Sequence, residues 1–118
     1  MLPVDLIGKA QVGKHLGDWV GFEIKTTVRT ASAITYTEGQ KKGADSFVRA
    51  TLMKAADENG VRWWPSDEVR GREAQAVLND MNEPKKRAFP GYVIEVTKVN
   101  SPDPQVRMFD WQDIGKKR

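Results

Sequence analysis

The chain holds few residues whose types and spacing suit catalysis. Its single histidine, His15, lies in a glycine-punctuated segment with no nucleophile motif beside it, so acid–base or triad chemistry is not expected there. The lack of cysteine excludes thiolate catalysis, disulfides and cysteine-ligated metal centres. The tightest acidic pair, Asp67 and Glu68, is adjacent in a segment that reads as a helix start, and adjacent helical residues do not face each other. We therefore predict a protein that is not an enzyme, with no catalytic residue, no metal site and no cofactor.

One segment has part of the spacing of a phosphate-binding loop. Gly8 and Gly13 bracket four residues, and Lys14 follows. However, His15 stands where such a loop needs a magnesium-binding hydroxyl, and no apolar strand of useful length precedes it. We expect a loop or a short helix here, without nucleotide hydrolysis.

Aromatic residues beside basic residues form the clearest functional pattern. Aromatic rings stack on bases while Lys and Arg neutralise phosphates, so a sheet face with both types is suited to DNA or RNA. The candidate nucleic-acid-binding residues are Trp19, Lys25, Arg29, Arg62, Trp63, Arg70, Lys85, Lys86 and Arg87. These residues form a binding surface only if folding brings them to one side of the molecule. On this basis we predict a non-catalytic nucleic-acid-binding protein.

A double tryptophan marks the centre of this pattern. Trp63 and Trp64 follow the hairpin signal Asn59-Gly60 and precede Pro65, which must end a strand or lie at a sheet edge. Consecutive strand residues point to opposite faces, so only one of the two tryptophans fills the core. The pattern does not decide which of them contacts a ligand.

A protein-binding module is the alternative function. Trp, Tyr and Arg dominate the energetics of protein interfaces, and an edge strand over 105–111 offers its backbone for strand addition. A partner-binding inhibitor, a subunit of a larger assembly or a self-associating protein has the same composition. Oligomeric state is left open.

Charge and hydropathy limit the environment. The net charge is +3, from 19 Lys and Arg against 16 Asp and Glu, which permits nucleic-acid binding without requiring it. No run approaches the ~20 apolar residues of a membrane span. The first residues lack a basic start and a sustained apolar stretch, so we expect no signal peptide and a cytoplasmic location.

Period-2 alternation predicts most of the secondary structure. The clearest strand is 18–30, in which Val20, Phe22 and Ile24 alternate with Glu23 and Lys25. We assign the apolar set to the core face and the charged set to the outer face. Further strands are predicted at 33–37, 61–64, 91–99 and 105–111.

Two segments determine how many strands and helices are predicted. The range 46–56 fits either, and we prefer a strand because a hairpin signal follows it. A helix is predicted over 72–81, where Ala74, Val77, Leu78 and Met81 share a face. Residues 1–17 are expected to form a short helix or loop.

These elements predict one α+β, mainly β domain over residues 1–118. Five to six short antiparallel strands with one helix suggest a small SH3-like or OB-like barrel. If 46–56 is helical, the barrel loses a strand. The basic tail at 115–118 is expected to be mobile.

Overall fold

The computed structural model describes residues 4–56 and 67–116. Over these residues the chain forms one open, mixed sheet of four strands in the spatial order β1-β2-β3-β4. The strands are β1 (Leu6–Lys9), β2 (Trp19–Thr26), β3 (Gly91–Thr97) and β4 (Gln105–Asp110). The two outer pairs are antiparallel, whereas the central strands β2 and β3 run parallel.

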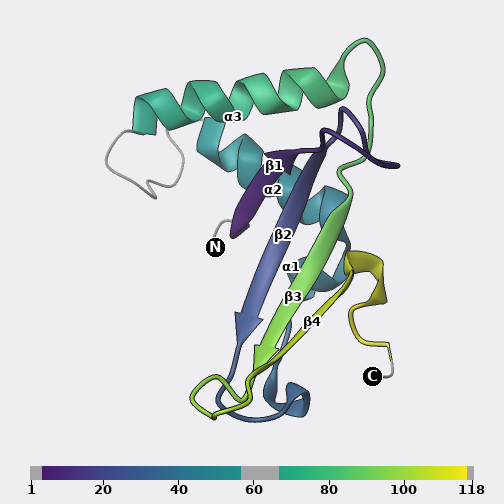
Figure 1. Ribbon diagram of the computed structural model, residues 1–118. Helices are drawn as coiled ribbons and strands as arrows, with labels where there is room; N and C mark the ends of the chain where they lie inside the picture. The colour runs from purple at the N-terminus through teal and green to yellow at the C-terminus, as the bar shows by residue number, and fades with distance from the viewer. Residues whose placement is uncertain (1–3, 57–66, 117–118) are drawn as a thin grey trace.

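The parallel pairing of β2 and β3 determines where the helices lie. Parallel neighbours cannot be joined by a tight turn, so a long crossover must connect them. The connection contains η1 (Ala31–Ala33), α1 (Glu38–Lys41), α2 (Ala44–Ala56) and α3 (Asp67–Asn82), and a short η2 (Trp111–Asp113) follows β4. The helices lie to one side of the sheet, with α3 packed across α2, and leave the other face open (Figure 1). Within the described ranges, no helix is both long and apolar enough to cross a bilayer.

Two glycines let α2 approach the central strands closely. A Cβ atom on Gly21 would lie 2.5 Å from Cγ2 of Val48 in α2. A Cβ atom on Gly91 would lie 2.5 Å from Cβ of Ala44 and 2.8 Å from Cε3 of Trp111. Both separations are shorter than van der Waals contact, so only glycine fits at these positions. The backbone of the parallel pair is therefore in direct contact with α2.

The hydrophobic core lies between α2, α3 and the sheet. It is built from one face of each helix together with residues of β3 and the flanking segments. Its buried members are Val4, Phe47, Val48, Leu52, Ala74, Leu78, Met81, Phe89, Val93 and Trp111. The indole N–H of Trp111 donates to the carbonyl oxygen of Gln40 at 2.8 Å, so the largest buried side chain is also hydrogen-bonded.

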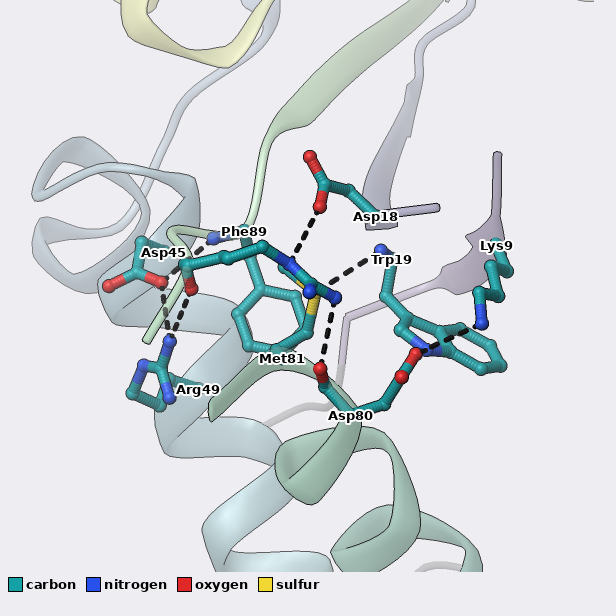
Figure 2. A network of polar contacts seen from close by, with 9 residues as sticks. Lys9, Asp18, Trp19, Asp45, Arg49, Asp80, Met81 and Phe89 are labelled. Atoms are coloured by element: carbon teal, nitrogen blue, oxygen red, sulfur yellow. Dashed lines mark hydrogen bonds and ion pairs between the residues drawn. The ribbon is translucent and has the colours of Figure 1, made fainter. Parts of the chain in front are cut away.

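A polar network joins the start of β2 to the end of α3 (Figure 2). The indole N–H of Trp19 donates to Oδ2 of Asp80 at 2.7 Å, and Nζ of Lys9 lies 3.2 Å from the same oxygen. These contacts, the Trp19 hydrogen bond first, hold the pKa of Asp80 below its usual value. Arg87 pairs with Asp18 at 3.0 Å and donates to the Asp80 carbonyl oxygen at 2.9 Å. The network fixes α3 against the first strand pair.

A second part of the network fixes the start of α2. Oδ1 of Asp45 accepts the backbone N–H of Phe89 at 2.9 Å and pairs with Arg49 at 3.1 Å (Figure 2). Arg49 also donates to the carbonyl oxygen of Arg87 at 2.9 Å. The segment that enters β3 is thereby attached to α2 at two points.

The barrel prediction is wrong, because the sheet is open, mixed and four-stranded. The prediction of an α+β chain is consistent with the structure. The error begins at 46–56, which belongs to helix α2: Phe47, Val48, Thr51 and Leu52 are buried at helical spacing. A two-residue alternation also fits these residues, so the sequence pattern alone did not separate the two elements.

Other elements differ in detail. Strands predicted at 91–99 and 105–111 correspond to β3 and β4, whereas 33–37 forms no strand. The helix predicted at 72–81 extends over 67–82 and continues through Gly71. Strand β1 lies within the segment expected to be a helix or loop. The range 61–64 lies outside the described residues.

The alternation predicted for β2 is present, but its two faces are exchanged. Gly21 and Glu23 face the helices and are buried, whereas Ile24 lies on the open face and is exposed. The assignment of the apolar set to the core was therefore wrong. The charged set lies under the helices instead.

Substitution of Gly91 by alanine is expected to destabilise the fold by about 1–3 kcal/mol, because the added Cβ atom overpacks against Ala44 and Trp111. Urea denaturation measures the change in the free energy of unfolding. Gly8→Ala in β1 is the matched control, since its Cβ atom would meet nothing within 4 Å. Equal stabilities for the two variants would contradict close contact between α2 and the sheet.

Candidate active site

Three charged side chains lie on the helix-facing side of the central strands. Glu23 and Lys25 belong to β2, and Glu95 of β3 stands opposite Lys25 in the parallel register. Glu23 is only 5% exposed and Glu95 is buried. Carboxylates are rarely buried unless they are paired or bind a cation, so each acid requires an explanation.

Asp5 extends this group from the neighbouring strand. Leu6 pairs with Phe22, so Asp5, which immediately precedes β1, lies beside Glu23 on the same face. Oδ2 of Asp5 accepts the backbone N–H of Ile24 at 2.8 Å, which fixes the carboxylate at the strand edge. Asp5 is exposed whereas Glu23 is buried, so the acidic pair extends from the surface into the molecule.

Helix α1 supplies a side-chain hydrogen-bond donor to Glu23. Gln40 is buried, and its side-chain amide donates to Oε2 of Glu23. Its side-chain oxygen accepts the backbone N–H of Thr37 at 2.9 Å in a capping box, and its carbonyl oxygen accepts the indole of Trp111. Gln40 is therefore held in one orientation before any ligand arrives.

The second oxygen of Glu23 lacks a donor. In the described part of the chain, Oε1 of Glu23 is buried and has no hydrogen-bond partner. Burial, and then the hydrogen bond and charge of neighbouring Asp5, raise the pKa of Glu23 to about 7, while Lys25 acts in the opposite direction. At neutral pH this carboxylate is therefore poised between its two protonation states.

Lys25 brings a positive charge to the same face. Its Nζ atom lies 5.2 Å from the ring centroid of Tyr36, within the range of a cation–π contact. The two-residue spacing on β2 directs Lys25 to the side of Glu23. Two carboxylates and an ammonium group are thus held next to one another by one hairpin.

The other buried acid, Glu95, has protein partners. The hydroxyl of Tyr36 donates to its Oε2 atom at 2.5 Å, and Nε of Arg107 lies 3.6 Å from Oε1. A cavity of about 460 Å³ adjoins this pair and is lined by Ala31, Glu95, Thr97, Gln105, Val106 and Arg107. Glu95 therefore links Tyr36, and through it Lys25, to β4.

The Asp5–Glu23 pair has the chemistry of a hard-cation site. Within residues 4–56 and 67–116, no three His, Cys, Asp or Glu side chains gather as ligands. A magnesium ion does not need such a set, because it commonly binds through one or two carboxylates, waters and substrate phosphates. The Oε1 atom of Glu23, which accepts no hydrogen bond, and the accessible carboxylate of Asp5 are suited to binding magnesium in this way.

The structure separates the predicted nucleic-acid-binding residues into groups. Trp19 is half-buried against Asp80, and Arg87 is engaged with Asp18, so both take part in the network of Figure 2. Lys25 lies in the candidate site, about 20 Å along β2 from Trp19 at ~3.3 Å per residue.

The remaining predicted residues lie elsewhere. Arg29 is exposed in the loop after β2, and Lys85 and Lys86 are exposed after α3. Arg62 and Trp63 are outside the described residues, as is the side chain of Arg70. Among those of the nine whose side chains the structure describes, only Lys25 contributes to the candidate site.

Sequence reasoning missed Asp5, Glu23 and Gln40. The available signal was Glu23 followed two residues later by Lys25 within an otherwise apolar strand. Charges in that position suit a surface, and only the packing of α2 shows that this face is covered. Gln40 gave no signal, because its position depends on the fold of the crossover.

No known protein family, curated protein or solved structure matches this chain. A function for the chain must therefore be derived from the chemistry of its own residues.

The raised pKa of Glu23 predicts a stability that falls with rising pH. The pKa of Glu23 is about 7 in the folded chain, against 4.5 for an ordinary glutamate. Ionisation of Glu23 is therefore less favourable in the folded chain than in the unfolded chain, and it lowers stability as the pH rises. Between pH 5 and pH 8, Glu23 should lower the free energy of unfolding by roughly 2–3 kcal/mol, a loss that Glu23→Gln should abolish. Urea denaturation of both proteins at the two pH values measures this difference. Parallel pH profiles would contradict the burial of an ionisable Glu23.

Proposed function

We propose that this protein is a magnesium-dependent hydrolase of phosphodiester bonds in nucleic acid. The observation that carries the proposal is the convergence of Asp5, Glu23 and Lys25 on one face of a hairpin, with the undonated oxygen of Glu23 buried beside Asp5. Buried acids that lower the stability of the folded chain and lie next to a lysine are typical of sites that bind a ligand or perform chemistry.

The carboxylates and the lysine have distinct roles in this proposal. Asp5 and Glu23 would hold one magnesium ion, together with waters and the substrate phosphate. When bound, the ion would supply a Lewis acid that neutralises charge on the phosphate oxygens. Lys25 orients the attacking water and stabilises the same developing charge.

The reaction consumes one water and breaks one P–O bond. The water oxygen forms a new bond to phosphorus and gives up one proton, and the leaving strand end departs as an oxygen that takes up a proton to become a hydroxyl. The other strand end retains the phosphate. No oxidant, reductant or organic cofactor is required.

Charge around the site favours a polyanionic substrate. Gln40 is followed directly by Lys41 and Lys42, both exposed, and Lys25 lies inside the site. The net charge of +3 supports association with phosphates in addition to these local charges. A nucleic acid suits such a surface better than a neutral ester does.

The proposed substrate is the nucleic acid predicted from the sequence, but the proposed activity is catalytic rather than binding alone. The change follows from the buried acidic pair, which that prediction did not include. The tryptophan and arginine residues expected to stack on bases are not needed for the reaction. A cytoplasmic location remains a prediction.

Magnesium or manganese should support cleavage of a labelled DNA or RNA oligonucleotide, and EDTA should abolish it. Asp5→Asn and Glu23→Gln should each lower the cleavage rate at least a hundredfold, because each removes a charged metal ligand. Asp103→Asn, in the exposed β3–β4 turn, is the matched control and should retain full activity. Gel analysis of the products provides the rates. Undiminished cleavage by Asp5→Asn, or no cleavage of DNA or RNA by the wild type with either metal, would overturn the proposal.

Lys25→Met separates catalysis from metal binding. We expect a loss of at least a hundredfold in cleavage rate, while magnesium still raises the melting temperature as it does in the wild type. Thermal unfolding with and without magnesium gives the second measurement. If the variant loses the metal-dependent shift as well, Lys25 acts by maintaining the site rather than in the reaction.

A further inference from the structure

The two faces of the sheet differ in charge. Charged side chains at the helix-facing positions of the four strands are Lys9, Glu23, Lys25, Glu95 and Arg107, whereas the opposite positions include a single charge, Asp110 at the end of β4. We call the uncovered side the open face. Its apolar residues are Leu6, Val20, Phe22, Ile24, Tyr92, Ile94, Val96, Val106 and Met108.

This distribution is the reverse of that in a free-standing two-layer fold. A sheet with one face in water normally presents polar residues there and apolar residues to the helices. Here Val106 is 70% exposed and Met108 61% on β4, and Ile24 is 43% exposed on β2. Ile94 and Val96 of β3 lie between the two strands on the same face. A contiguous exposed apolar patch of this kind marks an interaction surface.

The chain itself covers only one end of the open face. His15, in the segment between β1 and β2, places Nε2 3.1 Å from the hydroxyl of Tyr92. Toward the other end of the strands, the exposed Ile24, Val106 and Met108 have no such neighbour segment over them in the described chain. The helices lie on the opposite side (Figure 1).

The near absence of charged residues on the described open face excludes several classes of partner. Nucleic acid needs cations to neutralise its phosphates, and no described strand presents one on this side. A strongly acidic or basic protein surface gains nothing from a neutral face. A partner of matching character must itself be flat, apolar and uncharged.

We propose that the open face binds the open face of a second copy of this chain. A neutral apolar sheet is complementary to itself. When a twofold axis relates two copies, apolar side chains meet apolar side chains, and no cluster of like charges is brought together. The two sheets pack face to face about 10 Å apart, with the β-branched and aliphatic side chains between them.

The flat area of the open face supplies about half of what a standard interface takes from each partner. Strands about 4.8 Å apart with residues at ~3.3 Å spacing make this sheet about 20 Å by 20 Å, or roughly 400 Å² in flat projection. Side-chain relief and the flanking loops increase the accessible area above that value. A standard interface takes about a tenth of a small protein's surface, and this chain exposes 7881 Å² in total.

The assembly leaves the candidate active sites accessible. Asp5, Glu23 and Lys25 lie on the helix-facing side of each sheet, away from the proposed contact. Dimerisation can therefore be tested independently of the proposed hydrolysis.

Sedimentation equilibrium over a range of concentrations tests the proposal on the wild-type chain. We expect a dimer, with Met108→Lys and Ile24→Lys each raising the dimer dissociation constant at least tenfold, because each places a cation at the centre of an apolar contact. Met53→Lys is the matched control: Met53 is 58% exposed on α2, outside the open face, and its variant should dimerise as the wild type does. Far-UV circular dichroism establishes that each variant is folded.

Two results would overturn the proposal. One is a wild-type monomer at all concentrations. The other is a dimer whose dissociation constant is unchanged in folded Met108→Lys and Ile24→Lys, which would place the contact elsewhere on the molecule.

Discussion

The contact between α2 and the two central strands determines the rest of the architecture. Gly21 and Gly91 bring backbone, rather than side chains, against α2, and Trp111 fills the space beside them. Because α2 lies this close, the preceding α1 is held over Glu23, and Gln40 is fixed between Glu23 and Trp111. The position of Gln40 over Glu23 thus follows from one close approach of helix to sheet.

The acidic pair is a source of instability that packing compensates. Burial withholds water from Glu23, Asp5 adds like charge, and Gln40 satisfies only one of the two carboxylate oxygens. A carboxamide or an apolar residue would suit the same position in a purely structural strand. In the proposed function, a bound cation would supply the missing partner of the second Glu23 oxygen.

Sequence patterns predicted the strands better than the surfaces those strands form. Alternation located β2, β3 and β4, because each strand has two chemically distinct faces. It could not show which face the helices cover, and here the side with Glu23 and Glu95 is buried while that with Ile24 and Met108 is open. The range 46–56 fits both periods, so its helical state depended on the crossover that a parallel pair requires. Gln40 reaches the site only through tertiary packing, which no local spacing reveals.

The three residues of the proposed reaction all belong to the first hairpin. Asp5, Glu23 and Lys25 are placed by the antiparallel register of β1 and β2, a short-range pairing in the sequence. The crossover to β3, by contrast, spans more than half of the chain, and among its described residues Gln40 donates to the acidic pair. The hairpin therefore sets the positions of the three groups along the sheet. The helices set the burial of Glu23 and the hydrogen bond that it accepts.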